Sequence, residues 1–127
     1  MNVGDRMTRE PLMTARHVSL REAAQRMCER RVGSILVMDG ERLEGILTER
    51  DVLQVFARGD FDASVADVMT SNPETAEPDE GLEQAKLVML HGGFRHLPVV
   101  ENRRVVGILS MRDLFFAADE DAAPRGV

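Results

Sequence analysis

Gly45-Ile46-Leu47-Thr48-Glu49-Arg50-Asp51 recurs in this sequence as Gly107-Ile108-Leu109-Ser110-Met111-Arg112-Asp113. Both stretches run from an apolar strand, through a hydroxyl residue, into the first turn of a predicted helix. The hydroxyl residue, Thr48 or Ser110, is a candidate N-cap, and an Asp in the first turn complements the helix dipole. A hydroxyl, free N–H groups and a fixed carboxylate at a helix start also suit a phosphorylated sugar. A cap needs no Arg, so the recurring Arg-Asp pair favours a binding function.

The whole chain reads as a duplicated unit with a constant offset of 62 residues. Residues 3–8 align with residues 65–70, and further identities follow in the same register, such as Leu20 with Leu82 and Arg42 with Arg104. The predicted repeats span residues 3–58 and 65–117, joined by a linker at 59–64. A unit of about 60 residues is marginal alone, so we expect the two repeats to share a core. The tail at 118–127 lacks periodicity, and we predict that it is disordered.

Hydrophobic periodicity predicts the order strand–helix–strand–strand–helix in each repeat, which is an α/β (α+β) fold. In the first repeat Ser19 is the predicted cap of a helix that ends at Gly33, and Asp39-Gly40 marks a hairpin turn. The buried stripe of that helix is predicted to comprise Leu20, Ala23, Ala24, Met27 and Cys28. In the second repeat, Gly92-Gly93 ends the matching helix and Glu101-Asn102 turns the chain.

Composition excludes several classes of function. The net charge of −6 argues against non-specific binding to nucleic acid or to an anionic membrane, both of which need basic patches. Trp and Tyr are absent and Phe numbers five, so a base-stacking surface for single strands is not expected. The single Cys28 has no disulfide partner, which fits a reducing cytoplasm. No signal peptide and no apolar run of membrane-spanning length is visible.

Catalytic and metal-binding patterns are also missing from the sequence. His17 and His91 have no carboxylate or Cys at ligand spacing, so no metal site is expected. No Ser/His/Asp or Cys/His constellation and no phosphate loop of the GxxxxGK type is present. We therefore expect neither enzyme activity nor a catalytic cofactor.

Taken together, these elements resemble a tandem pair of cystathionine-beta-synthase (CBS) domains of the stand-alone bacterial type. The resemblance covers residues 3–117. It is carried by the two Gly-Ile-Leu-[Thr/Ser]-x-Arg-Asp stretches and by three further segments, Asp5-Arg6-Met7-Thr8, Asp67-Val68-Met69-Thr70 and Arg95-His96-Leu97-Pro98-Val99-Val100.

The resemblance implies a regulatory module whose repeats pack about a pseudo-twofold axis around a cleft for two adenosine-containing ligands. In such pairs the Asp binds the ribose hydroxyls, and the hydroxyl residue and the helix start contact the phosphate. The backbone of a strand recognises the adenine. One site would comprise Thr48, Arg50, Asp51, Thr70, Thr75, Phe94, Arg95 and His96. The other would comprise Ser110, Arg112, Asp113, Thr8, Met13, Val32, Gly33 and Ser34.

Two functional hypotheses follow. The first is a sensor of AMP, ADP, ATP, S-adenosylmethionine or a dinucleotide. A separate protein target would recognise its ligand-bound state. The second is a structural dimerisation module with an empty cleft. Because the second repeat has Arg95-His96 where the first has Gly33-Ser34, we expect unequal sites, with the Asp51 site binding phosphate more tightly.

A homodimer is expected under either hypothesis. The last helix carries consecutive Phe115 and Phe116, which cannot both point into one small core. In the resembling family, pairs associate through these second helices.

Overall fold

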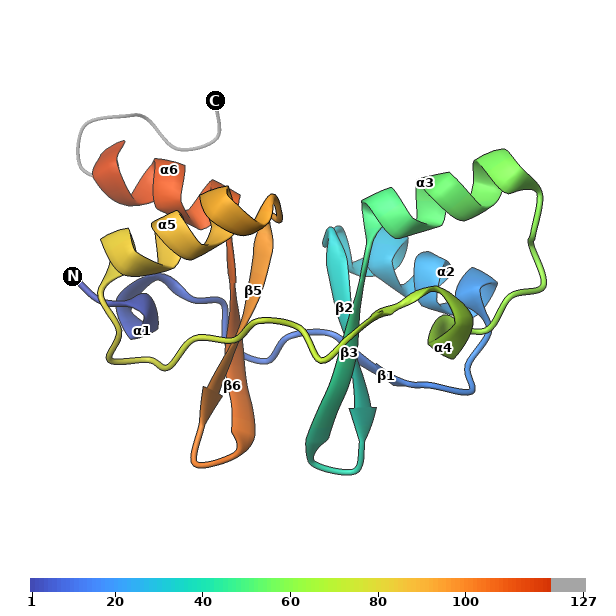
Figure 1. Cartoon of the computed structure of the whole chain (residues 1–127), viewed down its shortest axis with the longest axis horizontal. Helices are drawn as coiled ribbons and strands as arrows, with labels where there is room; N and C mark the ends of the chain where they lie inside the picture. Colours follow the sequence, from blue (N-terminus) through green and yellow to red (C-terminus); the bar gives the residue numbers. More distant parts are fainter. Residues whose placement is uncertain (120–127) are drawn as a thin grey trace. The chain divides into compact units, whose positions relative to one another are not determined.

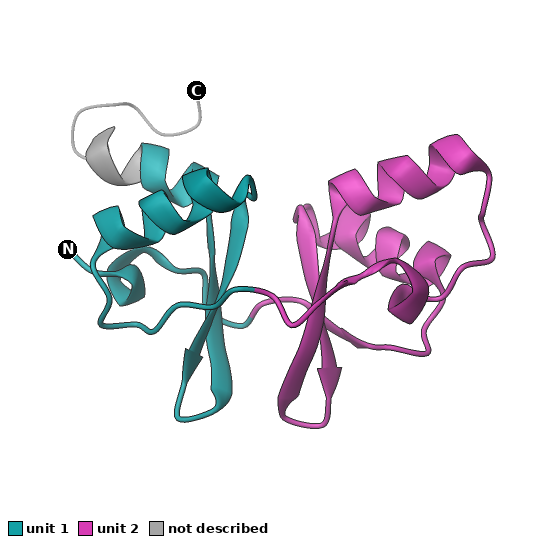
Figure 2. Cartoon of the chain, in the orientation of Figure 1, with its two compact units in different colours: residues 1–10, 74–127 teal, residues 11–73 magenta. Residues whose placement is uncertain are grey.

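A computed structural model describes residues 1–119 of the chain, with side chains through Phe115. The chain forms two compact units (Figure 2). Unit 1 combines residues 1–10 with the chain from residue 74 onward, and unit 2 is the continuous segment 11–73. Each unit is a mixed α+β structure that contains the predicted succession of helix, two antiparallel strands and helix, so the fold class is confirmed.

Unit 2 contains a four-stranded sheet in the order β1-β2-β3-β4. The pairing of β1 with β2 is parallel, and the other two pairings are antiparallel. The elements, labelled in Figure 1, are β1 (Met13–Ala15), α2 (Leu20–Arg30), β2 (Ser34–Asp39), β3 (Arg42–Thr48), α3 (Glu49–Arg58), α4 (Val65–Val68) and β4 (Thr70–Ser71). The predicted hairpin is confirmed, but its turn lies one residue later than expected, at residues 40 and 41, with Gly40 at a φ of 61°.

Unit 1 repeats this plan around a two-stranded antiparallel sheet. Its elements are α1 (Val3–Arg6), α5 (Leu82–Gly92), β5 (His96–Glu101), β6 (Arg104–Ser110) and α6 (Met111–Asp119). The predicted first strand of the second repeat is reduced to one parallel bridge, between Ala76 and Val99. Of the tail predicted to be disordered, residues 118 and 119 continue α6, and residues 120–127 lie outside the described residues.

The first six residues of each repeat, residues 3–8 and 65–70, are called its lead-in here, and each lead-in packs in the unit formed by the other repeat. Val3 in α1 is fully buried in the hydrophobic cluster of unit 1, and Val65 in α4 is fully buried in that of unit 2. After α1 the chain pairs with β6, because Thr8 and Ile108 exchange backbone hydrogen bonds of 2.8 and 2.9 Å. In unit 2, Thr70 pairs with Ile46 in the same way.

The packing of each lead-in against a strand of the other repeat explains why the recurring stretch begins with glycine. A Cβ atom on Gly45 would lie 2.6 Å from Met69 Sδ and 2.8 Å from the Thr70 carbonyl oxygen. A Cβ atom on Gly107 would meet the equivalent atoms of Met7 and Thr8 at 2.7 and 2.8 Å. The Met-Thr pair of each lead-in and the glycine of the facing strand are therefore parts of one close contact.

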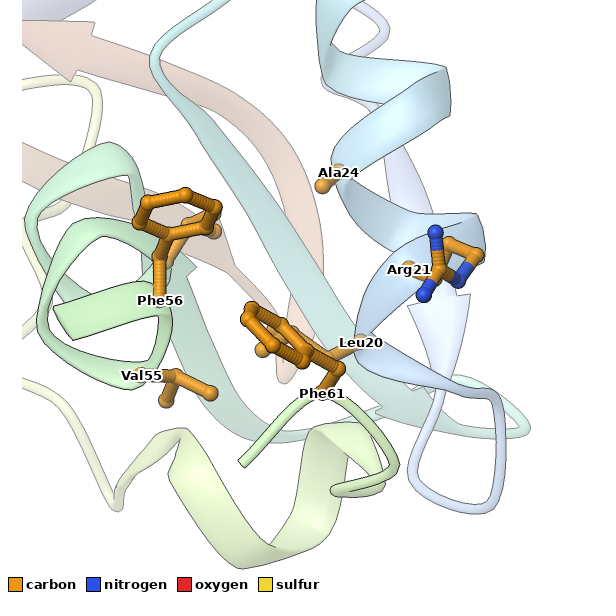
Figure 3. Close-up of a pocket in the computed structure, with 7 residues that line it drawn as sticks. Leu20, Arg21, Ala24, Val55, Phe56 and Phe61 are labelled. Carbon is orange, nitrogen blue, oxygen red and sulfur yellow. The ribbon is translucent and has the colours of Figure 1, made fainter. Parts of the chain in front are cut away.

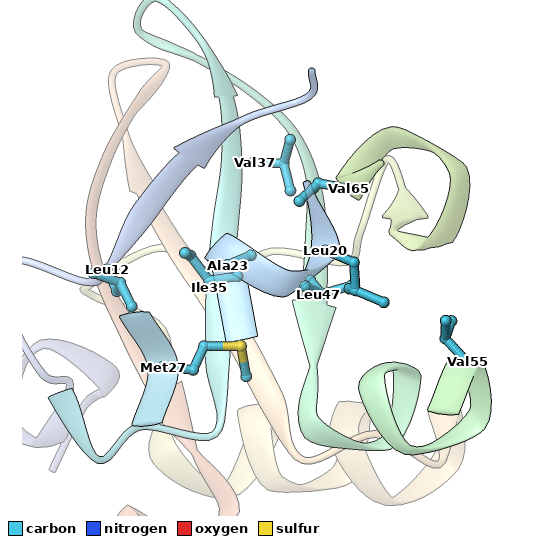
Figure 4. Packing of buried hydrophobic residues seen from close by; sticks show 9 residues of the cluster. All are labelled: Leu12, Leu20, Ala23, Met27, Ile35, Val37, Leu47, Val55 and Val65. Carbon is cyan, nitrogen blue, oxygen red and sulfur yellow. The ribbon is translucent and has the colours of Figure 1, made fainter. Parts of the chain in front are cut away.

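Each unit buries a hydrophobic cluster between its helices and one face of its sheet. Figure 4 shows the cluster of unit 2, which comprises Leu12, Leu20, Ala23, Met27, Ile35, Val37, Leu47, Val55 and Val65. The cluster of unit 1 comprises Val3, Ala76, Ala85, Met89, Leu97, Val99 and Leu109. Alternate strand residues point to the opposite face, which includes the buried Leu36 in unit 2 and Pro98 in unit 1.

Two predictions about α2 were wrong. Cys28 is exposed rather than buried, because the stripe that reaches the core is narrow and includes only Leu20, Ala23 and Met27. The helix ends at Arg30, with Arg31 in the left-handed conformation at a φ of 55°, and not at Gly33. The predicted Ser19 cap is confirmed, since its side chain accepts the N–H of Glu22 at 3.1 Å.

Candidate functional site

The start of α3 in unit 2 brings together the groups of the first recurring stretch. Thr48 ends β3 and is the N-cap of α3, and Asp51 follows in the first turn. Thr48 N–H donates to Asp51 Oδ2 at 2.8 Å, and the Thr48 hydroxyl donates to the same oxygen at 3.2 Å. Among the described residues, Asp51 Oδ1 accepts no hydrogen bond. The carboxylate is thus fixed by one oxygen while the other stays available.

The start of α6 in unit 1 has nearly the same geometry. Ser110 N–H donates to Asp113 Oδ2 at 2.8 Å, and Asp113 N–H donates to Ser110 Oγ at 3.3 Å. Asp51 and Asp113 are both half-buried, whereas the arginine that precedes each of them, Arg50 or Arg112, is exposed. Each unit therefore presents a helix start with a fixed carboxylate and an adjacent cationic side chain. We call these two positions the α3 mouth and the α6 mouth.

Strand register places further predicted residues beside each mouth. Ser34 lies directly opposite Thr48 in unit 2, and His96 lies directly opposite Ser110 in unit 1. Directly opposite residues of an antiparallel pair project from the same sheet face, with Cβ atoms about 5 Å apart. In both hairpins this is the face turned away from the helices, because the neighbouring Ile35 and Leu97 point into the hydrophobic clusters.

Backbone hydrogen bonds join the loop before each hairpin to the mouth of the same unit. The Gly33 carbonyl accepts the N–H of Glu49 at 3.1 Å, and the Arg95 carbonyl accepts the N–H of Met111 at 2.7 Å. Gly33 and Arg95 occupy equivalent positions in the two repeats, but only Arg95 adds a cationic side chain. The exposed Val32 precedes Gly33 at the α3 mouth.

The remaining predicted residues divide between the two units. Met13 lies on β1 opposite Leu36, on the same face as Ser34, and the exposed Thr70 lies on β4 opposite Ile46. In unit 1, Thr8 pairs with Ile108, and the exposed Thr75 precedes the bridge residue Ala76. Phe94 is half-buried, and its side chain packs against the hydrophobic cluster of unit 1.

The structure thus groups the predicted residues by unit. Unit 2 contains Met13, Val32, Gly33, Ser34, Thr48, Arg50, Asp51 and Thr70, and unit 1 contains Thr8, Thr75, Phe94, Arg95, His96, Ser110, Arg112 and Asp113. Sequence reasoning did not foresee that Ser34 lies beside Thr48, or His96 beside Ser110. The predicted Asp39-Gly40 loop would place Ser34 opposite Gly45 instead, because the turn lies at residues 40 and 41 and the register shifts between Val37 and Met38.

Two further classes of site were searched for among residues 1–119. No group of three or more His, Cys, Asp or Glu side chains in this part of the chain is arranged to hold a metal ion. None of its helices combines the length and the apolar character needed to cross a membrane.

Comparison with known proteins identifies the family. The model of the CBS domain matches this chain twice, at residues 3–58 and 65–120. The CBS domain-containing protein YhcV of Bacillus subtilis is 34% identical over 89% of this chain and 82% of its own length. A 17.7 kDa protein of Acidianus ambivalens is 39% identical over 77% of this chain, but the match spans only 61% of that relative. This chain therefore belongs to the CBS domain family and carries two copies of the domain.

Solved structures agree with this assignment. The CBS domain pair of protein MJ0100, solved with 5′-methylthioadenosine and S-adenosyl-L-methionine, has a TM-score of 0.89 and 26% identity, covering 94% of this chain and 97% of that chain. PAE2072 of Pyrobaculum aerophilum, solved with AMP, has a TM-score of 0.85 and 28% identity, covering 91% and 92% respectively.

Proposed function

We propose that this protein is a regulatory module that senses adenosine-containing nucleotides through its α3 and α6 mouths. The observation that supports this most directly is the fixed carboxylate at each mouth, whose Oδ2 is held by the cap while Oδ1 accepts no hydrogen bond from the described residues. A carboxylate held in this way is preorganised to accept hydrogen bonds from ribose hydroxyls. Family members solved with AMP, S-adenosyl-L-methionine and 5′-methylthioadenosine indicate the same class of ligand.

Each mouth also offers groups for a phosphate. The first N–H of each helix, that of Glu49 or Met111, is donated to a loop carbonyl, but the helix dipole still favours an anion at each mouth. The Ser110 hydroxyl accepts the N–H of Asp113 and can still donate to a phosphate, whereas the Thr48 hydroxyl already donates to Asp51. The adjacent Arg50 or Arg112 adds a positive charge at each mouth. An arginine guanidinium suits phosphate because it donates two parallel hydrogen bonds.

The two mouths differ in charge, which supports unequal affinities for phosphorylated ligands. Beside the α6 mouth lie Arg95 and His96, whereas Gly33 and Ser34 occupy the equivalent positions beside the α3 mouth. The neighbourhood within each unit therefore favours the α6 mouth for phosphate, the reverse of the order expected from the sequence. We accordingly propose that Asp113 belongs to the tighter site.

A thermal-shift screen tests the proposed class of ligand. We expect AMP, ADP, ATP or S-adenosylmethionine at ten times its dissociation constant to stabilise the folded protein by about 1.4 kcal/mol, because it binds only the folded state. Guanosine and cytidine nucleotides of equal charge serve as controls for non-specific anion binding. Equal shifts with every nucleotide, or no shift with any adenosine ligand at millimolar concentration, would contradict the proposal.

We also propose that the protein forms a homodimer through its helical faces. Leu53 and Phe56 of α3 are each 67% exposed, and Phe115 of α6 is 70% exposed. Each unit thus exposes large apolar side chains on a helix, which is typical of an interaction site. A dimer that covers these helices would remove all three from water.

Light scattering at tens of micromolar protein tests this assembly. The expected result is the mass of two chains, about twice the 14.2 kDa of one. Replacing Leu53 by Glu should shift the equilibrium toward monomer, because it would introduce a charge into the interface. A monomeric wild type at this concentration would refute the homodimer.

The same exposed side chains support the second candidate function, a structural module that dimerises without a ligand. The nucleotide screen separates the two functions. Dimer formation with no nucleotide-induced shift would favour the structural module. Dimer formation with an adenosine-specific shift would favour the sensor, whose state a separate protein target would read.

A further inference from the structure

The α3 mouth carries an acidic side chain that the α6 mouth lacks. Glu49 is the first residue of α3, and Met111 is the first residue of α6. The two residues occupy equivalent positions of the repeats, directly after Thr48 and Ser110. Glu49 is exposed, and among the described side chains its carboxylate forms neither an ion pair nor a hydrogen bond. Its negative charge is therefore not paired with a cation in the part of the chain that the structure describes.

The charges around the two mouths have opposite balance. At the α3 mouth the carboxylates of Glu49 and Asp51 accompany the single arginine of the recurring stretch. At the α6 mouth Asp113 is the one carboxylate of that stretch, and Arg95 adds a second guanidinium. The exposed Arg31 is the C-cap of α2, where its charge complements the dipole of that helix. An anionic ligand is therefore favoured at the α6 mouth and disfavoured at the α3 mouth.

The hydroxyl groups at the two mouths differ in the same direction. The Thr48 hydroxyl donates its proton to Asp51 Oδ2 at 3.2 Å, so this proton is already used. The Ser110 hydroxyl accepts the N–H of Asp113 at 3.3 Å and keeps its own proton for a ligand. A phosphate at the α3 mouth would thus meet the carboxylate of Glu49 without gaining a hydroxyl donor.

The position of Glu49 is set by the packing of α3. Leu20 of α2 and Val55 of α3 share the hydrophobic cluster of unit 2. An apolar groove of about 350 Å³ lies between the two helices, and Figure 3 shows Phe61 seated between them. At the mouth itself, the Glu49 N–H is donated to the Gly33 carbonyl at 3.1 Å. The helix is therefore a fixed part of unit 2, and the charge of Glu49 stays beside the α3 mouth.

We propose that the α3 mouth selects adenosine derivatives that carry a neutral or cationic group in place of the 5′-phosphate, and that Glu49 makes this selection. The inference rests on the proposed function and names the ligand class of one of the two mouths. With the ribose hydroxyls bound to Asp51, the 5′ group would lie at the start of α3. A phosphate there is repelled by Glu49, a thioether is unaffected and a sulfonium is attracted. The ligands found with the CBS domain pair of MJ0100, 5′-methylthioadenosine and S-adenosyl-L-methionine, are examples of the last two classes.

Three ligands that differ in charge at the 5′ position test the selection. AMP carries a phosphate, 5′-methylthioadenosine a neutral thioether and S-adenosylmethionine a sulfonium. Titration calorimetry in an Asp113→Ala background, in which the α6 mouth is impaired, measures binding at the α3 mouth. We expect AMP to bind there about fivefold more weakly than either of the other two ligands, because an exposed charge changes the affinity of a charged ligand by up to about that factor.

Glu49→Gln removes the charge and keeps the size of the side chain. In the same background this variant should strengthen AMP binding and weaken S-adenosylmethionine binding, each by about two- to fivefold. Binding of 5′-methylthioadenosine should stay unchanged, so the neutral ligand reports any general damage to the mouth. Glu22→Gln is the matched control and should change none of the three affinities, since Glu22 is an exposed glutamate in the first turn of α2.

The reciprocal variant transfers the charge to the other mouth. Met111→Glu in an Asp51→Ala background should weaken AMP binding at the α6 mouth by about two- to fivefold, because it places a carboxylate at the position equivalent to Glu49. Binding of 5′-methylthioadenosine is again the internal control.

The outcomes separate this selection from the proposed function itself. If none of the three ligands binds the wild-type protein, both are overturned. Binding that disappears entirely in the Asp113→Ala background overturns the inference about the α3 mouth but leaves a sensor with one working mouth. If AMP binds the α3 mouth most tightly, or if Glu49→Gln shifts all three affinities alike or none of them, only the selection by Glu49 is overturned.

Discussion

Asp51→Ala and Asp113→Ala are each expected to weaken binding of an adenosine nucleotide at the affected mouth by about 10- to 150-fold. A charge-assisted hydrogen bond from a ribose hydroxyl contributes about 1.5–3 kcal/mol, and its loss lowers the affinity by that factor. Titration calorimetry with AMP and ATP measures the effect. Because Arg95 and His96 lie in unit 1, we expect Asp113→Ala to remove the tighter of two binding events.

Each substitution also removes a helix cap, so a control for capping is needed. Asp67 accepts the N–H of Ser64 at 3.1 Å in α4, outside both mouths, and this hydrogen bond lowers the pKa of its carboxyl group. Asp67→Ala should therefore remove a capping hydrogen bond of the same kind without affecting nucleotide affinity. Unchanged affinity in both mouth variants, or an equal loss in Asp67→Ala, would contradict a direct role of Asp51 and Asp113 in binding.

Gly45→Ala and Gly107→Ala are expected to destabilise the fold by about 1–3 kcal/mol each. The added methyl group would come within 3 Å of a methionine sulfur and of a backbone carbonyl oxygen, and relieving such overpacking requires shifts of the strand or of the lead-in. A methionine side chain can move aside, but the carbonyl oxygens of Thr8 and Thr70 are held by strand pairing. Chemical denaturation measures the change in the free energy of unfolding.

Gly81→Ala is the matched control, since a Cβ atom at Gly81 would meet nothing within 4 Å and its φ of −67° is open to any residue. We expect a clearly smaller effect there. If Gly45→Ala and Gly107→Ala were as stable as Gly81→Ala, the close contact between lead-in and strand would not constrain the recurring stretch.

Elements set by local chemistry could be predicted from the sequence. Asp39-Gly40 marks a hairpin between two apolar strands, and Gly93 ends its helix in the left-handed conformation, as the Gly92-Gly93 pair predicted. The mouths were predictable for the same reason, because Thr48 and Asp51 need only each other and the first turn of α3 to form their hydrogen bonds.

Features set by packing were harder to predict. Cys28 lies at the edge of its apolar stripe, and whether such an edge is buried depends on which element covers it. Arg31 adopts a left-handed conformation although the local sequence offers Gly33 two residues later. The contact between the two lead-ins and the strands of the opposite repeats joins residues far apart in sequence, such as Thr8 and Ile108, so no local pattern could reveal it.

Because each lead-in packs in the unit of the other repeat, the two units can be completed only in one order during synthesis. Unit 2 is one continuous segment, and all its strand partners have been made once residue 73 is in place. Unit 1 begins with the first ten residues but must wait for β6, so Val3 stays without its buried site until β6 has been made. Closing unit 1 also means bringing together segments separated by all of unit 2, a long-range contact of the kind that slows folding. The two repeats therefore share a sequence pattern but are completed at different stages of synthesis.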